Sequence, residues 1–329
     1  MRSSLLRLTS ILALFAVLAA GGLSGCTRGK QAAPTAQSTQ SSSTAQPTQD
    51  ASQADKSPGF PLTVVDGMKR EVRLVSKPGR IVSLIPAGTE ILFALGAGDR
   101  VVGVTKFCNY PAEALQKDKV GDYSNPSIEV IASLKPHLVV GDFIHPELAD
   151  RLESMGFPVF LTNSQSVADT VQAIRLIGRA IGEDKAAETL ASGMESRVAA
   201  IRAKVGSIPE SSRPKVFHEM WNEPLMTSGP GTIMDDLIRQ AGGINVAGDA
   251  KTLYPEYSLE ALIAKNPDVI VYTYHNDLGK SRGNRWAGIK AVKEGRVHLL
   301  VDDLVSRPGP RIIEGLEDLA KRIHPDLFR

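Results

Sequence analysis

Cysteine, aromatic side chains and net charge are all scarce in this sequence. Its 329 residues include 2 cysteines and 5% aromatic residues, and the formal net charge is only +2. Arg2 and Arg7 are the only charged side chains of the first 25 residues, so the rest of the chain is neutral overall. A neutral chain lacks the concentrated basic surface that nucleic acids require. We therefore expect no nucleic-acid partner.

The apolar run near the start, residues 11–20, is also too short to span a membrane, which takes roughly 20 residues. It follows two arginines and precedes small residues, which is the pattern of a secretory signal over residues 1–25. The segment Leu23-Ser24-Gly25-Cys26 resembles the lipobox of bacterial lipoproteins. The resemblance implies that Cys26 is acylated and anchors the mature protein on the extracytoplasmic face of the cell membrane. A plain secretory signal with an incidental cysteine is the alternative.

The segment after the signal is poor in residues that build a core. Residues 27–58 are rich in Ser, Thr, Gln, Ala and Pro and contain no Leu, Ile, Val, Met or aromatic residue. Such a segment buries too little apolar surface to offset its ordering entropy. We expect a disordered tether over 26–58, with a reach of roughly 30 Å. Acylation of Cys26 would leave Cys108 without a disulfide partner.

Regular short elements begin at about residue 60, in a chain whose 42% hydrophobic content is ample for a packed core. Residues 61–75 predict a β-hairpin with its turn at Asp66-Gly67. Residues 80–85 and 101–104 predict buried strands. Between these strands, Thr89 is expected to N-cap a helix that runs to Gly96.

One pattern occurs twice in the chain. Residues 127–140 predict a serine-capped helix, a proline turn and a buried strand, and residues 258–271 repeat this order in the same register. The upstream strand at 81–83 corresponds to 215–217, and Thr232 occupies the place of Thr89. This duplication predicts an α/β fold of two similar lobes with mostly parallel sheets. A ligand cleft is expected between the lobes.

The middle of the chain predicts two consecutive helices. Residues 166–182 have apolar side chains at helical spacing, and a second helix follows over 186–205. We expect one of them to form a rigid link between the lobes. The predicted division is therefore an N-terminal lobe over 59–165, connecting helices over 166–205 and a C-terminal lobe over 206–329.

Several segments resemble one family. The run from Arg80 to Gly96 is similar to the opening of the class III substrate-binding proteins of ABC importers. The other segments that carry the resemblance are 102–105, 109–111, 134–136 and 307–311. The resemblance covers about residues 60–329. It implies partnership with an ABC permease and ATPase, capture of a small molecule, modest lobe closure and no enzymatic activity.

Within that family, residues 107–111 and 121–126 are most similar to the cobalamin-binding lipoproteins. This resemblance implies that cobalamin or another corrinoid is the transported ligand, and no resident cofactor is expected. Ferric-siderophore and haem receptors share the family's fold and form the first alternative. A divalent-metal receptor is the second.

Two glutamates occupy matching places in the repeat. Glu129 and Glu260 each lie two residues after the serine expected to cap a helix. A carboxylate there complements the helix dipole, which is a purely structural reading. The resemblance implies that the two glutamates dock onto arginines of the permease. Two separated carboxylates would fix the orientation of docking more than its affinity.

The candidate ligand contacts are aromatic side chains and one late loop. Phe107 matches the position where cobalamin binders place an aromatic ring against the corrin, while Tyr123, Trp221 and Tyr254 lie in predicted loops. A large flat ligand needs such aromatic faces, although ordinary packing is the alternative for each. The loop that aligns with a ligand-contacting loop of the family comprises Leu304, Val305, Ser306, Arg307 and Pro308. A guanidinium at Arg307 suits amide or phosphate oxygens, and a plain surface charge is its alternative.

Other reactive residues carry weaker signals. His145, His218 and His275 lie near predicted strand ends, but their spacing matches no recognised metal motif, and we expect no metal site. Iron ligation by His218 or Met220 has no support in the sequence. Cys108 is expected to be a small buried hydrophobic residue rather than a cobalt ligand.

Phosphate-binding and dinucleotide-binding motifs are missing from the mature sequence, which contains no phosphate-binding loop and no G-x-G-x-x-G fingerprint. The G-x-S-x-G pattern of a nucleophile elbow occurs once, at Gly279-Lys280-Ser281-Arg282-Gly283, and by itself is a weak signal. A hydrolase is the alternative from another functional class, and turnover of any substrate by the purified protein would favour it. The sequence predicts a binding protein.

Overall fold

The structure is a computed structural model that describes residues 59–273 and 284–328. All described residues belong to one compact unit. The signal peptide, Cys26, the tether and His275 lie outside the described residues. The lobe boundaries given above stay predictions. No helix within the described residues is both long and apolar enough to cross a bilayer.

The N-terminal lobe contains a parallel sheet of five strands in the order β5-β4-β3-β6-β7. Its strands are β3 (Ile81–Ser83), β4 (Val101–Val104), β5 (Asp118–Lys119), β6 (Leu138–Asp142) and β7 (Val159–Thr162). Apart from Asp142, every residue of β3 and β6 is buried, as expected for central strands with both faces covered. The predicted hairpin is confirmed as β1 (Leu62–Val65) and β2 (Glu71–Leu74).

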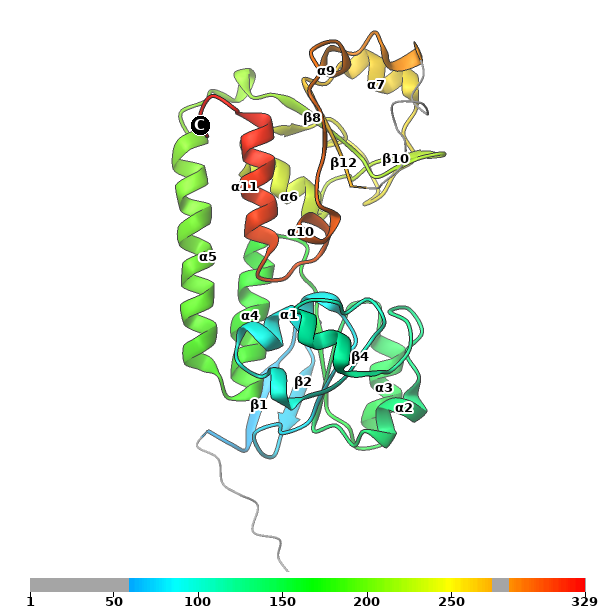
Figure 1. Cartoon of the computed structure of the whole chain (residues 1–329), viewed down its shortest axis with the longest axis vertical. Helices are drawn as coiled ribbons and strands as arrows, with labels where there is room; N and C mark the ends of the chain where they lie inside the picture. The colour runs from blue at the N-terminus through cyan, green and yellow to red at the C-terminus, as the bar shows by residue number, and fades with distance from the viewer. Residues whose placement is uncertain (1–58, 274–283, 329) are drawn as a thin grey trace, which may run out of the picture. The chain divides into compact units, whose positions relative to one another are not determined.

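The helices of this lobe connect its parallel strands (Figure 1). They are α1 (Pro86–Ala94), α2 (Ile128–Ser133) and α3 (Pro146–Ser154), with short 3-10 turns at Gly98–Arg100 and Ala112–Gln116. Ser127 caps α2 as predicted, because its hydroxyl accepts a hydrogen bond from the Val130 amide. The cap predicted at Thr89 is wrong. Pro86, with its preset φ, begins α1, and the Thr89 hydroxyl instead donates to Ser83 Oγ within the fold.

The C-terminal lobe repeats this plan with a four-stranded parallel sheet in the order β11-β8-β12-β13. Its strands are β8 (Lys215–Glu219), β11 (Ile244–Asn245), β12 (Val269–Tyr272) and β13 (Val297–Leu299), beside the hairpin β9 (Trp221–Asn222) and β10 (Leu225–Met226). The central strand β8 lies between β11 and β12 just as β3 lies between β4 and β6. The duplication seen in the sequence is therefore a duplication of sheet topology.

Helices again join these strands, and two further helices, α10 and α11, follow the last strand. They are α6 (Ile233–Gln240), α7 (Leu259–Lys265), α9 (Lys290–Lys293), α10 (Asp302–Ser306) and α11 (Ile312–Ile323), with 3-10 turns at Glu210–Ser212 and Asn284–Trp286. Thr232 caps α6 and Ser258 caps α7 through their hydroxyl oxygens. Both caps agree with the sequence pattern.

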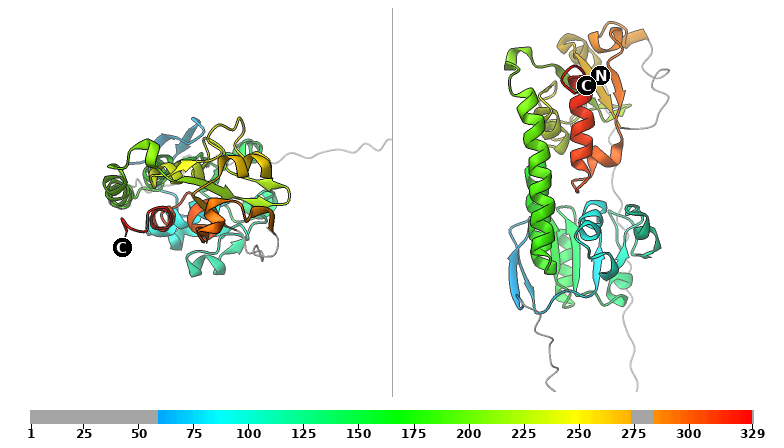
Figure 2. Two further views of the ribbon diagram at one scale, coloured as in Figure 1. Left: turned by 90° about the horizontal axis from the view of Figure 1, so that it is seen from above. Right: turned by 60° about the vertical axis from the view of Figure 1, so that its left-hand side comes forward.

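A hairpin of two helices, α4 (Val167–Ile181) and α5 (Asp184–Val205), links the lobes (Figures 1 and 2). Gly182 ends α4 in the left-handed conformation, with a φ of 70°. The two helices approach so closely that a Cβ atom at Gly178 would collide with Ala187. The 22-residue helix α5 packs against α4 in the hairpin and against α11 of the C-terminal lobe. The link is thus helical, as the sequence predicts.

Candidate functional site

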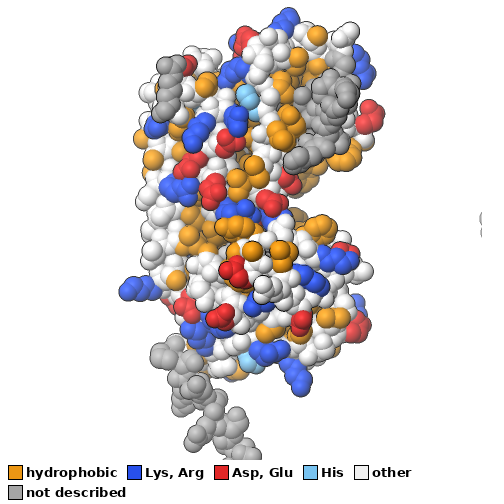
Figure 3. Space-filling model, in the orientation of Figure 1, with side chains coloured by type: hydrophobic (Ala, Val, Ile, Leu, Met, Phe, Trp, Pro, Cys, Tyr) orange, Lys and Arg blue, Asp and Glu red, His pale blue; other side chains and the backbone are white. Residues whose placement is uncertain are grey.

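A cavity of about 430 Å³ lies between the two lobes. Figure 3 shows this face of the molecule hollowed between the lobes, with hydrophobic side chains along the walls. The N-terminal lobe contributes the carboxyl ends of β6 and β7, the start of α1 and two loops, and the C-terminal lobe contributes α10 and the residues after it. Carboxyl ends of parallel strands are the usual ligand side of an α/β sheet. The volume is in the normal range of ligand pockets.

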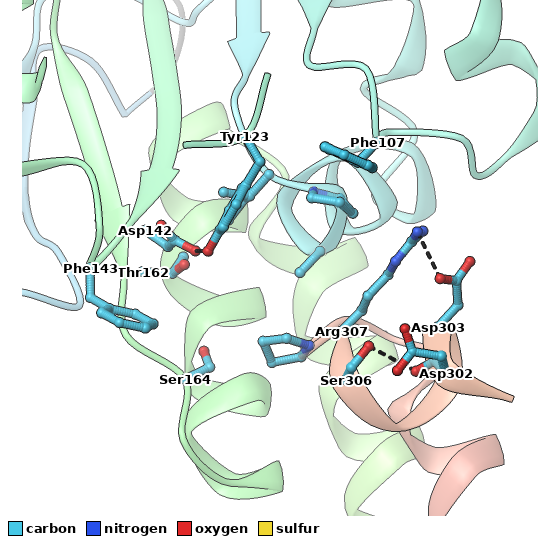
Figure 4. Close-up of a pocket in the computed structure, with 14 residues that line it drawn as sticks. Phe107, Tyr123, Asp142, Phe143, Thr162, Ser164, Asp302, Asp303, Ser306 and Arg307 are labelled. Atoms are coloured by element: carbon cyan, nitrogen blue, oxygen red, sulfur yellow. Dashed lines mark hydrogen bonds and ion pairs between the residues drawn. The ribbon is translucent and has the colours of Figure 1, made fainter. Parts of the chain in front are cut away.

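Aromatic side chains line the wall of the N-terminal lobe (Figure 4). Phe107 is 56% exposed and Phe143 is 45% exposed, so both rings offer open faces to a ligand. Tyr123 lines the same wall. Phe143 was missed by the sequence reasoning. Its signal is its place directly after Asp142, the last residue of β6.

Two other predicted aromatic contacts lie in the C-terminal lobe. Trp221 is on β9 and Tyr254 is in the loop before α7, and each is nearly half exposed. Neither is among the residues that line the cavity.

Tyr123 belongs to a network of three side chains at the cavity wall, of which Tyr123 and Asp142 line the cavity. Its hydroxyl donates to Asp142 Oδ2 at 2.6 Å, and the His145 ring contacts Asp142 Oδ1 at 2.8 Å and the Tyr123 carbonyl oxygen at 2.7 Å. Burial and the Asp142 carboxylate raise the pKa of Tyr123, so its phenol stays neutral. Burial alone would lower the pKa of His145, but its hydrogen bonds to Asp142 and Tyr123 raise it. Both ring nitrogens of His145 are engaged, which argues against metal ligation there.

Charged side chains form the wall of the C-terminal lobe. Asp302 and Asp303 begin α10, and Arg307 follows it (Figure 4). The Arg307 guanidinium contacts Asp303 at 2.7 Å and Asn109 Oδ1 at 2.7 Å, and its side chain is only 14% exposed. Asp303 and Asn109 therefore fix the Arg307 side chain in the cleft, and Arg307 is not a plain surface charge.

Only part of the predicted late loop faces the cavity. Ser306, Arg307 and Pro308 line it. Val305 is 1% exposed and packs in the core, and Leu304 is not among the lining residues. The reason is local: residues 302–306 form the helix α10, which turns Val305 inward. The sequence-based expectation that Val305 contacts the ligand does not agree with its buried position.

The remaining reactive side chains are buried away from the cavity. Cys108 is fully buried, with its sulfur 3.3 Å from Thr105 Oγ1, as expected of a small hydrophobic residue. His218 contacts Ser228 Oγ at 2.8 Å, and burial lowers the pKa of His218 to about 4. Within residues 59–273 and 284–328, no group of three His, Cys, Asp or Glu side chains is placed to hold a metal ion.

Glu129 and Glu260 occupy the second positions of α2 and α7, one on each lobe (Figure 1). Both are exposed. The Glu129 carboxylate accepts a hydrogen bond from the Ser127 hydroxyl at 2.9 Å. Its own backbone amide and this hydroxyl lower the pKa of Glu129, so it is ionised at neutral pH. The two lobes thus present matching surface carboxylates.

Two parallel-sheet lobes, a helical link and a cleft between them define a two-lobed solute-binding protein. The model of the periplasmic binding protein family matches residues 81–304. The chain belongs to this family, and within it to the class III substrate-binding proteins of ABC importers. Proteins of this family are extracytoplasmic, non-enzymatic carriers that work with a permease and an ATPase.

Three relatives illustrate the range of the family. An uncharacterized ABC transporter substrate-binding lipoprotein of Bacillus subtilis, YvrC, is 37% identical over 83% of this chain and 89% of its own length. A cobalamin-binding protein of Halobacterium salinarum is 31% identical over 82% of this chain and 76% of its own. The periplasmic haem-binding protein RhuT of Roseiflexus is 32% identical with a TM-score of 0.67, covering 76% of this chain and 99% of its own.

Proposed function

We propose that this protein captures cobalamin or a related corrinoid in the cleft and delivers it to its ABC permease. The relative from Halobacterium is named a cobalamin-binding protein, which supports this ligand class. The aromatic wall supports it as well, because Phe107 and Phe143 offer faces to a large flat macrocycle. A haem or ferric-siderophore receptor is the second candidate, and the haem-binding relative favours it.

The charge of the cleft walls is the observation that carries the choice. Asp142, Asp302 and Asp303 line the cavity, whereas Arg307 is the only cationic side chain among its described lining residues. Arg307 is already paired with Asp303. Corrinoids carry carboxamide groups, whose N–H donors suit carboxylate acceptors. Haem carries two propionate carboxylates, which these walls would repel.

The state of Tyr123 points the same way. A tyrosine that ligates ferric iron, as in catalase, does so through its oxygen, which must give up its proton to act as an anionic ligand. Burial and the nearby Asp142 carboxylate raise the pKa of Tyr123 and favour the neutral phenol. The hydroxyl also donates a hydrogen bond to Asp142. Both facts favour contact with a neutral ligand surface over ligation of iron.

Calorimetric titration of the purified full chain tests this proposal. Cyanocobalamin, cobinamide, haem and a ferric siderophore would be titrated separately under the same conditions. We expect saturable binding of a corrinoid and binding of haem that is at least about tenfold weaker, a difference of about 1.4 kcal/mol. Saturable binding of haem or the siderophore without binding of either corrinoid would contradict the proposal.

We further propose that Cys26 carries a lipid anchor and that Glu129 and Glu260 dock the protein onto the permease. The name of the Bacillus relative, a lipoprotein, supports the anchor. The matching exposure of the two glutamates supports the docking. Labelled palmitate should enter the wild-type chain in bacterial cells and should not enter Cys26→Ser. Equal labelling of both chains would contradict the anchor.

A further inference from the structure

A buried carboxylate joins the two lobes beside the cavity. Glu90, on α1, is 3% exposed. Arg311, at the start of α11, donates two hydrogen bonds to this carboxylate. Its Nε lies 2.9 Å from Oε2, and its Nη2 lies 2.6 Å from Oε1. Such two-point pairing is the strongest geometry between these groups. Arg307 adds a longer ion pair to Glu90 at 3.6 Å.

Other contacts of the two arginines also cross between the lobes. The Arg311 guanidinium lies 3.8 Å from the centre of the Tyr110 ring, and Arg307 donates to Asn109 at 2.7 Å. Both arginines come from the C-terminal lobe, while Glu90, Asn109 and Tyr110 belong to the N-terminal lobe. We call this set the Glu90 clamp. Arg307 is its only member that also lines the cavity.

We propose that Glu90 is a selectivity residue of the cleft: by pairing Arg307 and Arg311, it withholds their positive charge from the ligand. This inference builds on the proposed function, because it names the residue that makes the cleft disfavour anionic macrocycles. A buried carboxylate between two guanidinium groups cancels charge that would otherwise attract propionates. The same contacts hold α1 against the loop before α11 and thereby fix that edge of the cleft.

The substitution Glu90→Gln tests the inference. Glutamine keeps the shape and one acceptor oxygen, but it removes the negative charge, so the cleft gains one unit of positive charge. We expect the ratio of the dissociation constants of haem and cobinamide to shift about tenfold in favour of haem, as one added charge acting across a partly desolvated cleft would produce. An unchanged ratio in a folded Glu90→Gln chain would overturn the inference.

Glu317→Gln is the matched control. Glu317 on α11 also accepts two hydrogen bonds from one arginine, Arg197 on α5. Nε and Nη2 of Arg197 each lie 2.8 Å from a Glu317 carboxylate oxygen. That pair is not among the residues of the cavity. We expect Glu317→Gln to leave the haem-to-cobinamide ratio of the wild type unchanged. An equal shift in both variants would also overturn the inference, because it would show a general effect of charge.

A second readout does not depend on the identity of the ligand. Phenylglyoxal modifies accessible arginines, and peptide mass mapping locates the modified residues. We expect Arg311, which Glu90 holds directly, to be protected in the wild type and to react in Glu90→Gln, while Asp303 and Asn109 continue to hold Arg307. This readout decides the matter if the wild type binds neither macrocycle, which would refute the proposed ligand alone. Equal reactivity in both chains would overturn the clamp.

Should Glu90→Gln fail to fold, the double variant Glu90→Gln/Arg311→Gln removes both partners of the buried pair together. Loss of both charges avoids an unpaired buried guanidinium. A shift of the haem-to-cobinamide ratio toward haem in this variant would support the inference, because Arg307 has then lost its ion pair with Glu90, and an unchanged ratio would overturn it.

Discussion

The two walls of the cleft differ although the two lobes share one sheet topology. The N-terminal wall presents the open rings of Phe107 and Phe143 and a neutral Tyr123 phenol. The C-terminal wall presents Asp302, Asp303 and a paired Arg307. The difference shows that duplication set the scaffold while the loops and α10 set the ligand chemistry. Under the proposed function, one wall would contact the face of the macrocycle and the other its polar periphery.

The largest expected effect concerns a surface where the lobes are alike. We expect Glu129→Ala/Glu260→Ala to bind ligand as the wild type does and to lose uptake completely, because docking loses one carboxylate on each lobe. Uptake into vesicles that contain the permease and ATPase measures the change.

Glu71→Ala/Glu210→Ala is the control for docking, since it also removes one exposed carboxylate from each lobe. We expect this variant to transport normally. Normal uptake by the Glu129/Glu260 double variant would refute the docking role and would leave the lobes without a common functional surface.

The next effect tests the aromatic wall. Phe107→Ala should weaken corrinoid binding by about thirtyfold, or about 2 kcal/mol, because an open aromatic face is lost. Phe107→Tyr should keep the affinity within about threefold, because the ring remains. Calorimetry of both variants provides the measurement. An affinity of Phe107→Ala equal to that of the wild type would show that the N-terminal wall does not contact the macrocycle.

The smallest expected effect concerns His145, which contacts Asp142 and the Tyr123 carbonyl oxygen. The pKa of His145 is raised in the folded state, so its protonated ring stabilises the fold below its ordinary pKa of 6.5. This contribution is lost as the pH rises through the raised pKa. We therefore expect the difference in melting temperature between wild type and His145→Gln to be larger at acidic than at alkaline pH.

The partner residue provides the control for this pH dependence. In an Asp142→Asn background the His145 ring loses its carboxylate partner, so the difference caused by His145→Gln should depend less on pH. A difference that grows toward alkaline pH in the wild-type background would show that His145 is held neutral, contrary to this account.

Local signals in the sequence predict much of the fold. The hairpin at Asp66-Gly67, the serine caps at Ser127 and Ser258 and the repeated helix-to-strand pattern each depend on neighbouring residues, and the structure confirms them. Thr89 misled because threonine before an apolar run also suits a first helical turn, where Pro86 had already begun the helix. Capping signals are therefore ambiguous next to proline.

The site is less predictable because long-range packing decides it. The sequence pattern singled out Phe107, Tyr123 and Arg307, which the structure places in the cavity wall. It did not indicate the pairing of Glu90 with Arg311, since these two residues lie far apart in the chain. It also passed over Asp142 and Phe143 at the end of β6. Val305 misled because a loop assignment does not reveal that α10 turns this residue into the core.

Direct competition between two macrocycles tests the central claim that the walls favour an amide-bearing ligand over a carboxylate-bearing one. The full chain would first be loaded with haem and followed by its absorbance while cobinamide is added. We expect equimolar cobinamide to displace most of the haem from the wild type. Glu90→Gln should retain more haem than the wild type under the same conditions. The expected tenfold difference between the two dissociation constants corresponds to about 1.4 kcal/mol. Haem that stays bound to the wild type in a tenfold excess of cobinamide would contradict this claim.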